Sequence, residues 1–216
     1  MKWSDLIITL SKKGYDVLSN SNTTAKLLLF HHPINSDLLS LEMKQPQNKY
    51  DILIWGSVIR YKGIAEFLEF LHSSKNENRY KILIVGKCSD LDYKAEVENL
   101  CNSNIEFRDI FTSFEEVKGY ISNSRYVLFP YIGNSVSSSG ALIDSITMNG
   151  SCIGPSVGAF KDLAEENLCL TYDKYEDIID ILEKEIIIKR TDIDRFTRDN
   201  TWDQFAKSLK VELEKL

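Results

Sequence analysis

The sequence ILIWGSVIRYKG, residues 52–63, contains the pattern that decides the fold. Its first four residues are apolar, a glycine follows at once, and two cations, Arg60 and Lys62, precede a second glycine. The apolar run is too short for a helix and has the branched and aromatic residues that strands favour. Residues 64–71 then carry apolar side chains on one face, as an amphipathic helix does. The stretch therefore predicts a buried strand, a turn with two cations, and a helix.

The same order, a short apolar run followed by an amphipathic stretch, recurs along the chain. The predicted strands are residues 6–8, 26–30, 51–55, 81–85, 105–107, 126–129 and 151–153. The predicted helices of the main alternation are residues 64–71, 93–100, 114–121, 142–148, 175–187 and 202–216. This alternation predicts right-handed βαβ units and an α/β fold, a Rossmann-like parallel sheet with helices on both faces.

One polar, proline-containing stretch, residues 42–49, interrupts the alternation. It separates a strand-helix-strand piece at about residues 4–34 from the main series, which starts at Tyr50. We expect a domain boundary there, with residues 1–45 before it and residues 46–216 as the main domain.

Composition and charge exclude several classes of function. The 26 Lys and Arg residues against 32 Asp and Glu give a net charge of -6, which disfavours nucleic-acid binding. Three histidines and four dispersed cysteines offer no metal-ligand spacing, so we expect no metal. The sequence has no membrane-span-length apolar run, and no leader-like run before Lys12, so we expect a cytoplasmic protein. It also has neither G-x-G-x-x-G nor G-x-S-x-G.

Ligands of open parallel sheets bind beyond the carboxyl ends of the strands, and three predicted loops lie there. In residues 56–63, Arg60 and Lys62 suit an anion such as a diphosphate, although charges in a solvated loop are also common. In residues 130–141, four serines and two glycines precede a helix; they suit phosphate or ribose oxygens, or only cap that helix. Residues 153–162 form a glycine-rich turn that by itself indicates no more than a tight turn.

Taken in order, these loops resemble the carboxyl-terminal, donor-binding domain of family 4 glycosyltransferases, which have the GT-B fold. The similar segments are residues 52–63, 80–86, 104–109, 126–140 and 141–158, so the resemblance covers about residues 50–216. Residues 4–15 and 30–34 resemble the end of the family's amino-terminal, acceptor-binding domain. Residues 200–205 resemble the start of its last helix, which crosses back onto that domain. The resemblance implies half of a two-domain enzyme, with a remnant of the other half at residues 1–45.

The resemblance also implies roles for particular residues. Arg60 and Lys62 would be catalytic, because they would hold the donor diphosphate and neutralise charge on the leaving nucleotide. The implied donor-binding set is Gly56, Ser57, Asp109, Tyr131, Asn134, Ser137, Ser138, Ser139, Gly140, Ala141 and Ser145. The family's E-x(7)-E motif falls on Ser137 and Ser145, so both glutamates are absent, and Asp144 lies one position away. The sugar and ribose contacts must therefore differ from those of the family.

The resemblance implies a retaining glycosyltransferase that moves a sugar from a UDP- or GDP-sugar to a glycan or lipid-linked acceptor, in cell-surface polysaccharide biosynthesis. No cofactor and no metal are expected, and the site of action would be the cytoplasm or the inner face of the membrane, with peripheral contact. A second hypothesis is a donor-binding module that is inactive alone, a truncated, split or pseudo-enzyme that needs an acceptor-domain partner chain. A third, a nucleotide-binding epimerase, lacks the carboxylate and histidine pairs that such enzymes use.

Overall fold

The computed structural model describes residues 4–42, 49–133 and 136–216, and its main feature is one parallel sheet. The six strands of this sheet are ordered β5-β4-β3-β6-β7-β8. Their bounds are β3 Tyr50–Trp55, β4 Ile82–Val85, β5 Ile105–Arg108, β6 Ser124–Leu128, β7 Cys152–Pro155 and β8 Leu170–Tyr172. The predicted Rossmann-like parallel sheet is thereby confirmed.

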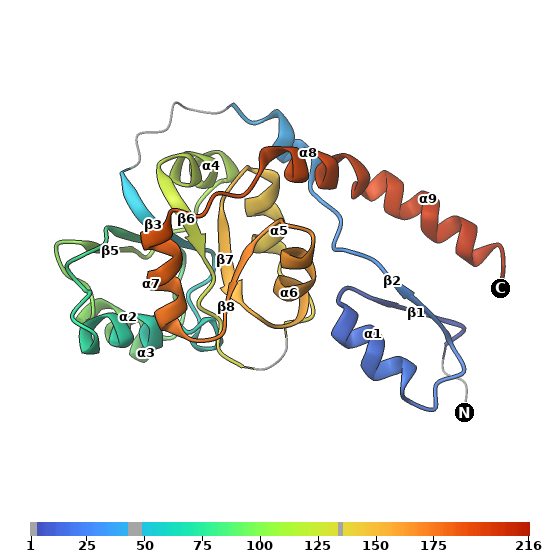
Figure 1. Cartoon of the computed structure of the whole chain (residues 1–216), viewed down its shortest axis with the longest axis horizontal. Coiled ribbons are helices and arrows are strands. Elements are labelled where there is room, and N and C mark those ends of the chain that lie inside the picture. The colour runs from blue at the N-terminus through green and yellow to red at the C-terminus, as the bar shows by residue number, and fades with distance from the viewer. Residues whose placement is uncertain (1–3, 43–48, 134–135) are drawn as a thin grey trace.

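Helices cover both faces of this sheet, as the sequence predicts (Figure 1). One apolar core lies under α2 Ile64–Ser73, α3 Leu91–Asn99 and α7 Tyr175–Lys184. The other lies under α4 Phe114–Ser122, α5 Gly140–Thr147, α6 Gly158–Glu165 and α8 Arg190–Asp199. Alternate residues of the central strand β3 enter opposite cores, Ile52 and Ile54 on one side and Leu53 on the other. A strand buried on both faces needs the continuous apolar run that residues 52–55 provide.

A second, smaller unit precedes the main sheet. It consists of β1 Leu6–Thr9, α1 Lys12–Ser19 and β2 Lys26–Leu29, and its two strands pair in parallel. A 3₁₀ turn, η1 Ser36–Ser40, follows β2. The last helix, α9 Trp202–Leu213, returns to this unit, as Figure 1 shows. The rings of Phe30 and Phe205 meet edge to face at 4.9 Å there.

The two sheets are separate, and the polar stretch predicted as a boundary lies between them. Residues 43–48 of that stretch lie outside the described residues, and the division into residues 1–45 and 46–216 stays a prediction. The small unit also touches the main domain, because the backbone N–H of Lys12 donates to Asp162 on α6 at 2.7 Å. The amino-terminal unit and the main domain therefore face one another across α1 and α6.

Two elements are absent from the prediction, and several predicted ends differ from the observed ones, that of α7 by three residues. Strand β8 was missed because it has only three residues, of which only Tyr172 is buried. Helix α8 was missed because its sequence, RTDIDRFTRD, is mostly charged, with only Ile193 and Phe196 as buried apolar residues. Helix α7 ends at Lys184 rather than Ile187, since Glu185 adopts the left-handed conformation with φ of 50°.

Candidate functional site

The candidate site lies beyond the carboxyl ends of β3, β6 and β7, where open parallel sheets usually bind their ligands. Backbone hydrogen bonds join its loops. Ile132 donates to Tyr61 at 3.0 Å, and Ala159 donates to Val136 at 2.9 Å. The three loops that the sequence singles out, around residues 56–63, 130–141 and 153–158, therefore form one surface.

Lys62 is the buried cation of this surface. It ends the 3₁₀ turn η2 Arg60–Lys62, and only 7% of the residue is exposed. Its Nζ lies 5.8 Å from the centroid of the Tyr131 ring and 3.1 Å from the point where a Cβ on Gly56 would stand. No hydrogen bond or ion pair reaches Nζ from the residues that the structure describes. Burial lowers the pKa of Lys62 to about 8, because a desolvated ammonium without a counter-ion is disfavoured.

Gly56 provides the space for this lysine. Its φ of +95° lies in the region where glycine is favoured, and its missing side chain leaves room for Nζ. Gly63 follows Lys62 with φ of +65° and allows the chain to enter α2 directly. In the Gly-x(5)-Lys-Gly spacing, the first glycine thus leaves room for the lysine side chain to point inward, and the second glycine lets the helix begin directly after it.

Tyr131 connects Lys62 to the serine loop. The residue is 8% exposed, and its ring packs edge to face against Phe129 and Phe160, which hold it in place. Its hydroxyl lies 3.3 Å from Ser139 Oγ. Burial raises the pKa of Tyr131 to about 12, so the phenol stays neutral. One side chain therefore contacts both the lysine and the start of α5.

The serine loop ends at the amino terminus of α5. Ser139 is the N-cap, and its Oγ accepts from Leu142 N at 3.3 Å. The N–H groups of Gly140 and Ala141 have no acceptor within the helix, because the first turn of any α-helix leaves its donors unpaired. Ser138 Oγ is buried and has no hydrogen-bond partner within the described parts of the chain. Ser137 is exposed, and the predicted Asn134 lies outside the described residues.

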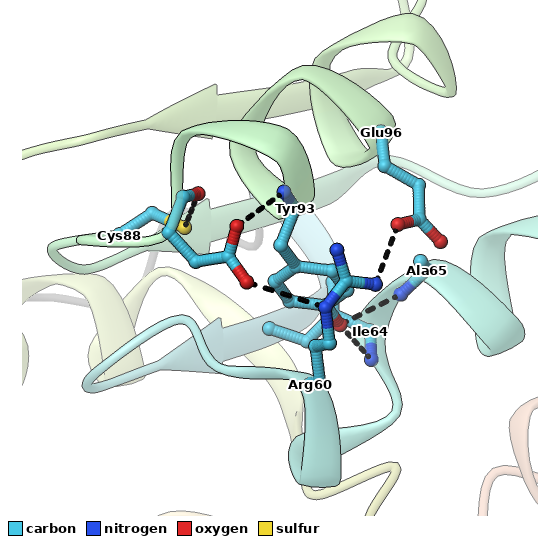
Figure 2. A network of polar contacts seen from close by, with 7 residues as sticks. Arg60, Ile64, Ala65, Cys88, Tyr93 and Glu96 are labelled. Atoms are coloured by element: carbon cyan, nitrogen blue, oxygen red, sulfur yellow. Dashed lines mark hydrogen bonds and ion pairs between the residues drawn. The ribbon is translucent and has the colours of Figure 1, made fainter.

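The structure does not bring Arg60 to this group of residues. Its guanidinium lies 3.2 Å from Asp90 and 2.9 Å from Glu96, both on or at the start of α3, and stacks 4.9 Å from the Tyr93 ring (Figure 2). Arg60 and Lys62 therefore contact different neighbours, although they are two residues apart in one turn. The sequence predicts a shared role for the two cations, and the structure shows only Lys62 beside Tyr131.

Asp109 and Ser145 already have hydrogen-bond partners within the protein. Asp109 accepts from Lys94 at 2.7 Å, Lys87 at 3.2 Å and the Cys88 N–H at 3.0 Å, which hold its pKa well below its usual range. Ser145 is fully buried; it donates to Ala141 O at 2.7 Å and accepts from Trp55 Nε1 at 2.8 Å. Their predicted contacts with a ligand stay predictions. The exposed Ser57 sits on the rim of the loop after β3.

Sequence reasoning did not identify Tyr93, a further group near the site. The Tyr93 hydroxyl accepts from Ile64 N at 3.2 Å and Ala65 N at 3.3 Å, so it caps the start of α2 (Figure 2). The carboxyl of Asp144, already noted in the sequence beside the motif, is half-buried on α5, and burial raises its pKa to about 6. Tyr93 could not have been found from the sequence, because no motif links a residue to a helix 28 positions before it.

Two hollows flank the turn at Ser156 and Val157. One, of about 480 Å³, is lined by Tyr131, Gly133, Tyr172 and Tyr175. The other, of about 690 Å³, lies between α1 and α6. Together they leave open space on both sides of the loops that form the site.

Neither a membrane span nor a metal centre is present in the described residues. No helix among them has the length and apolar character needed to cross a bilayer. Within the same residues, no three His, Cys, Asp or Glu side chains gather where they could hold a metal ion.

Comparison with known proteins identifies the fold. No family model matches the chain, and no curated protein sequence is similar to it. A glycosyltransferase from Rickettsia africae ESF-5 matches with a TM-score of 0.77 and 13% identity, over 97% of this chain and 63% of that chain. A UDP-forming α,α-trehalose-phosphate synthase from Burkholderia vietnamiensis matches with a TM-score of 0.66 and 8% identity, over 98% and 60%.

A third match is a carboxyl-terminal domain by itself, that of a glycosyl transferase group 1 family protein (LpcC) from Francisella tularensis. The TM-score is 0.55 and the identity 17%, over 81% of this chain and 97% of that domain. The present chain spans 60% to 63% of the length of the first two structures. It has the fold of the carboxyl-terminal domain of GT-B glycosyltransferases.

Proposed function

We propose that the chain is a glycosyltransferase of the family 4 type that binds a UDP- or GDP-sugar through its diphosphate. The observation that carries this proposal is Lys62, a cation that is 7% exposed and has no anionic partner among the described residues. A buried charge without a partner is costly, and where it faces a ligand site the ligand can supply the counter-charge. Its position at the ligand-binding edge of the sheet indicates an anion as that ligand.

The groups around Lys62 support a phosphate ligand in particular. Ser138 Oγ and the N–H groups of Gly140 and Ala141 are donors, and the helix dipole of α5 adds positive potential at the same end. Lys62 and Ser139 both contact Tyr131, so these donors and the cation lie in one neighbourhood. A diphosphate offers enough oxygens to meet both. In a transfer reaction these groups would stabilise the charge that develops on the leaving nucleoside diphosphate.

The remaining features of the proposal follow from the resemblance. They are retention of configuration, a glycan or lipid-linked acceptor in polysaccharide biosynthesis, and action in the cytoplasm or at the inner face of the membrane without a cofactor or metal. The absence of both motif glutamates means that serines, Ser137 on the exposed loop among them, would meet the sugar. Gly56, Ser57, Asp109, Asn134 and Ser145 stay in the proposed donor-binding set.

Donor binding should weaken as the pH rises above about 8, because the pKa of Lys62 is lowered to about 8. Below that pH the free protein carries the ammonium that the diphosphate needs, and above it the charge is lost. Titration of UDP or GDP at pH 7 and pH 9 should show roughly tenfold weaker binding at pH 9. The variant Lys62→Met should show no such fall. Equal wild-type affinities at the two pH values would contradict the assignment of Lys62.

A donor-binding module that needs an acceptor-domain partner is the second candidate function. Two observations favour it. In the described residues, the sheet of the amino-terminal unit has only β1 and β2. The present chain also spans only 60% to 63% of the length of two matched glycosyltransferase structures. The partner would be the acceptor-binding half of a GT-B enzyme.

Turnover separates the two candidates. The chain is incubated with UDP-glucose, UDP-N-acetylglucosamine and GDP-mannose, and release of the nucleoside diphosphate is followed. A transferase should release UDP or GDP faster than its Lys62→Met variant does. Binding without release, restored to turnover when an acceptor-domain chain is added, would identify the module.

A further inference from the structure

We propose that Asp90 and Glu96 are positioning residues that hold Arg60 away from the donor site, and that the diphosphate draws Arg60 off these carboxylates when it binds. The inference rests on the proposed function, and it deepens it by naming a step that sets donor affinity. Arg60, the second predicted catalytic cation, already has two carboxylate partners.

Both partners are within direct contact of the guanidinium. Arg60 Nε lies 3.2 Å from Asp90 Oδ2, and a terminal nitrogen of Arg60 lies 2.9 Å from Glu96 Oε2. The Cζ atom of Arg60 lies over the Tyr93 ring, 4.9 Å from its centroid. Figure 2 shows the two side chains next to each other. Arginine is suited to this arrangement, since its planar fork can pair with carboxylates and stack on an aromatic ring at once.

Asp90 is held at the start of α3, whereas the long side chain of Arg60 can rotate. Asp90 is the N-cap of α3 and accepts from Tyr93 N at 3.0 Å, and Glu96 lies on the same helix. Tyr93 in turn caps α2 through its hydroxyl, so α3 and the start of α2 are joined. Arg60 lies in a three-residue 3₁₀ turn and reaches α3 with a long side chain. A rotation of that side chain breaks the contacts without moving either helix.

The exchange of carboxylates for phosphate is energetically accessible. The side chains of Arg60, Asp90 and Glu96 are 53%, 44% and 39% exposed, and exposed ion pairs contribute little to stability. A diphosphate bound beside Lys62 would offer the guanidinium a bidentate, charge-assisted partner in place of its two single contacts with carboxylates. Arg60 belongs to the same turn as Lys62, so the anion at Lys62 lies near the base of the arginine side chain.

A double-mutant cycle tests the exchange. Binding of UDP, GDP and inorganic pyrophosphate is measured by calorimetry for the wild type, Arg60→Ala, the pair Asp90→Asn with Glu96→Gln, and all three changes together. Asparagine is also a good N-cap, so Asp90→Asn keeps the start of α3, and a melting temperature for each variant checks the fold. The control pair is Asp92→Asn with Glu98→Gln, which removes two charges from α3 without touching Arg60.

Freeing Arg60 should tighten binding at least threefold in the Asp90/Glu96 variant, and Arg60→Ala should weaken it about tenfold, as loss of a charge-assisted contact does. In the triple variant the gain should vanish, and the control pair should bind like the wild type. An equal gain in the triple variant or in the control pair would overturn the exchange and indicate general charge repulsion. Unchanged binding in a folded Asp90/Glu96 variant would overturn it too. If the wild type binds none of the three probes, the proposed function itself fails.

Discussion

Replacing Lys62 by methionine is expected to weaken UDP or GDP binding at least tenfold and to make the free protein more stable. The loss of affinity follows because a hydrogen bond to a charged group contributes roughly 1.5–3 kcal/mol. The gain in stability follows because the ammonium is largely desolvated without a counter-ion, and methionine fills a similar volume without that cost. A residue whose removal helps the fold and harms binding is retained for its function.

The pH dependence of stability follows from the same lysine. Its folded-state pKa of about 8 lies below the ordinary value of 10.5. The charged lysine therefore lowers the free energy of unfolding by its full amount below pH 8. This cost, on the order of 3 kcal/mol, fades as the pH rises from 8 to 10.5. Urea unfolding of Lys62→Met and wild type should therefore give a difference that is largest near pH 7 and small at pH 10.5.

Lys118→Met is the matched control for this prediction. Lys118 is 4% exposed, and burial lowers its pKa as well, but it lies on α4, outside the loops that form the site. The variant should be at least as stable as the wild type and should bind UDP or GDP equally well. If Lys62→Met bound the nucleotides as the wild type does, Lys62 would be a structural lysine and the site would lie elsewhere.

Replacing Gly63 by alanine is expected to lower the free energy of unfolding by about 3 kcal/mol and to weaken nucleotide binding. Its φ of +65° is unfavourable for other residues, and a Cβ there would stand 2.1 Å from Pro130 O and 2.8 Å from Ile132 Cγ2. The left-handed conformation costs about 1–2 kcal/mol and the displaced backbone about as much again. Because Tyr131 lies between those two residues, the shift also moves the ring that Lys62 contacts.

Gly119→Ala provides the opposite result in the same chain. Gly119 lies inside α4, and a Cβ there would meet nothing within 4 Å. The change should raise the free energy of unfolding by about 1 kcal/mol, the usual preference of a helix for alanine. Urea unfolding measures both variants. A Gly63→Ala protein as stable as the wild type would show that Pro130 and Ile132 do not pack closely against the backbone at Gly63.

The features that the sequence predicted well are local ones. The run at residues 52–55, the glycine after it and the spacing to Lys62 are neighbours in the chain, so periodicity and residue type were enough to predict the strand and the turn. The structure confirms one of the two interpretations of the serine loop, the helix cap, and leaves phosphate or ribose binding a prediction. Ser139 caps α5, while Ser138 has a buried hydroxyl without a partner.

The features that the sequence could not predict are contacts between distant residues. Arg60 meets its carboxylates 30 and 36 positions later, and Trp55 donates to Ser145, 90 positions away. The spacing of residues within a loop does not predict which helix the loop will contact in the folded protein. Arg60 was therefore grouped with Lys62 by proximity in the chain, and only the tertiary structure separates their surroundings.

Calorimetric titration of UDP and of GDP into the folded chain at pH 7 tests the central claim most directly. One of the two should bind at a single site, and Lys62→Met should weaken that binding at least tenfold, the loss expected for one charged contact. A folded wild-type protein that binds neither nucleotide would contradict the account.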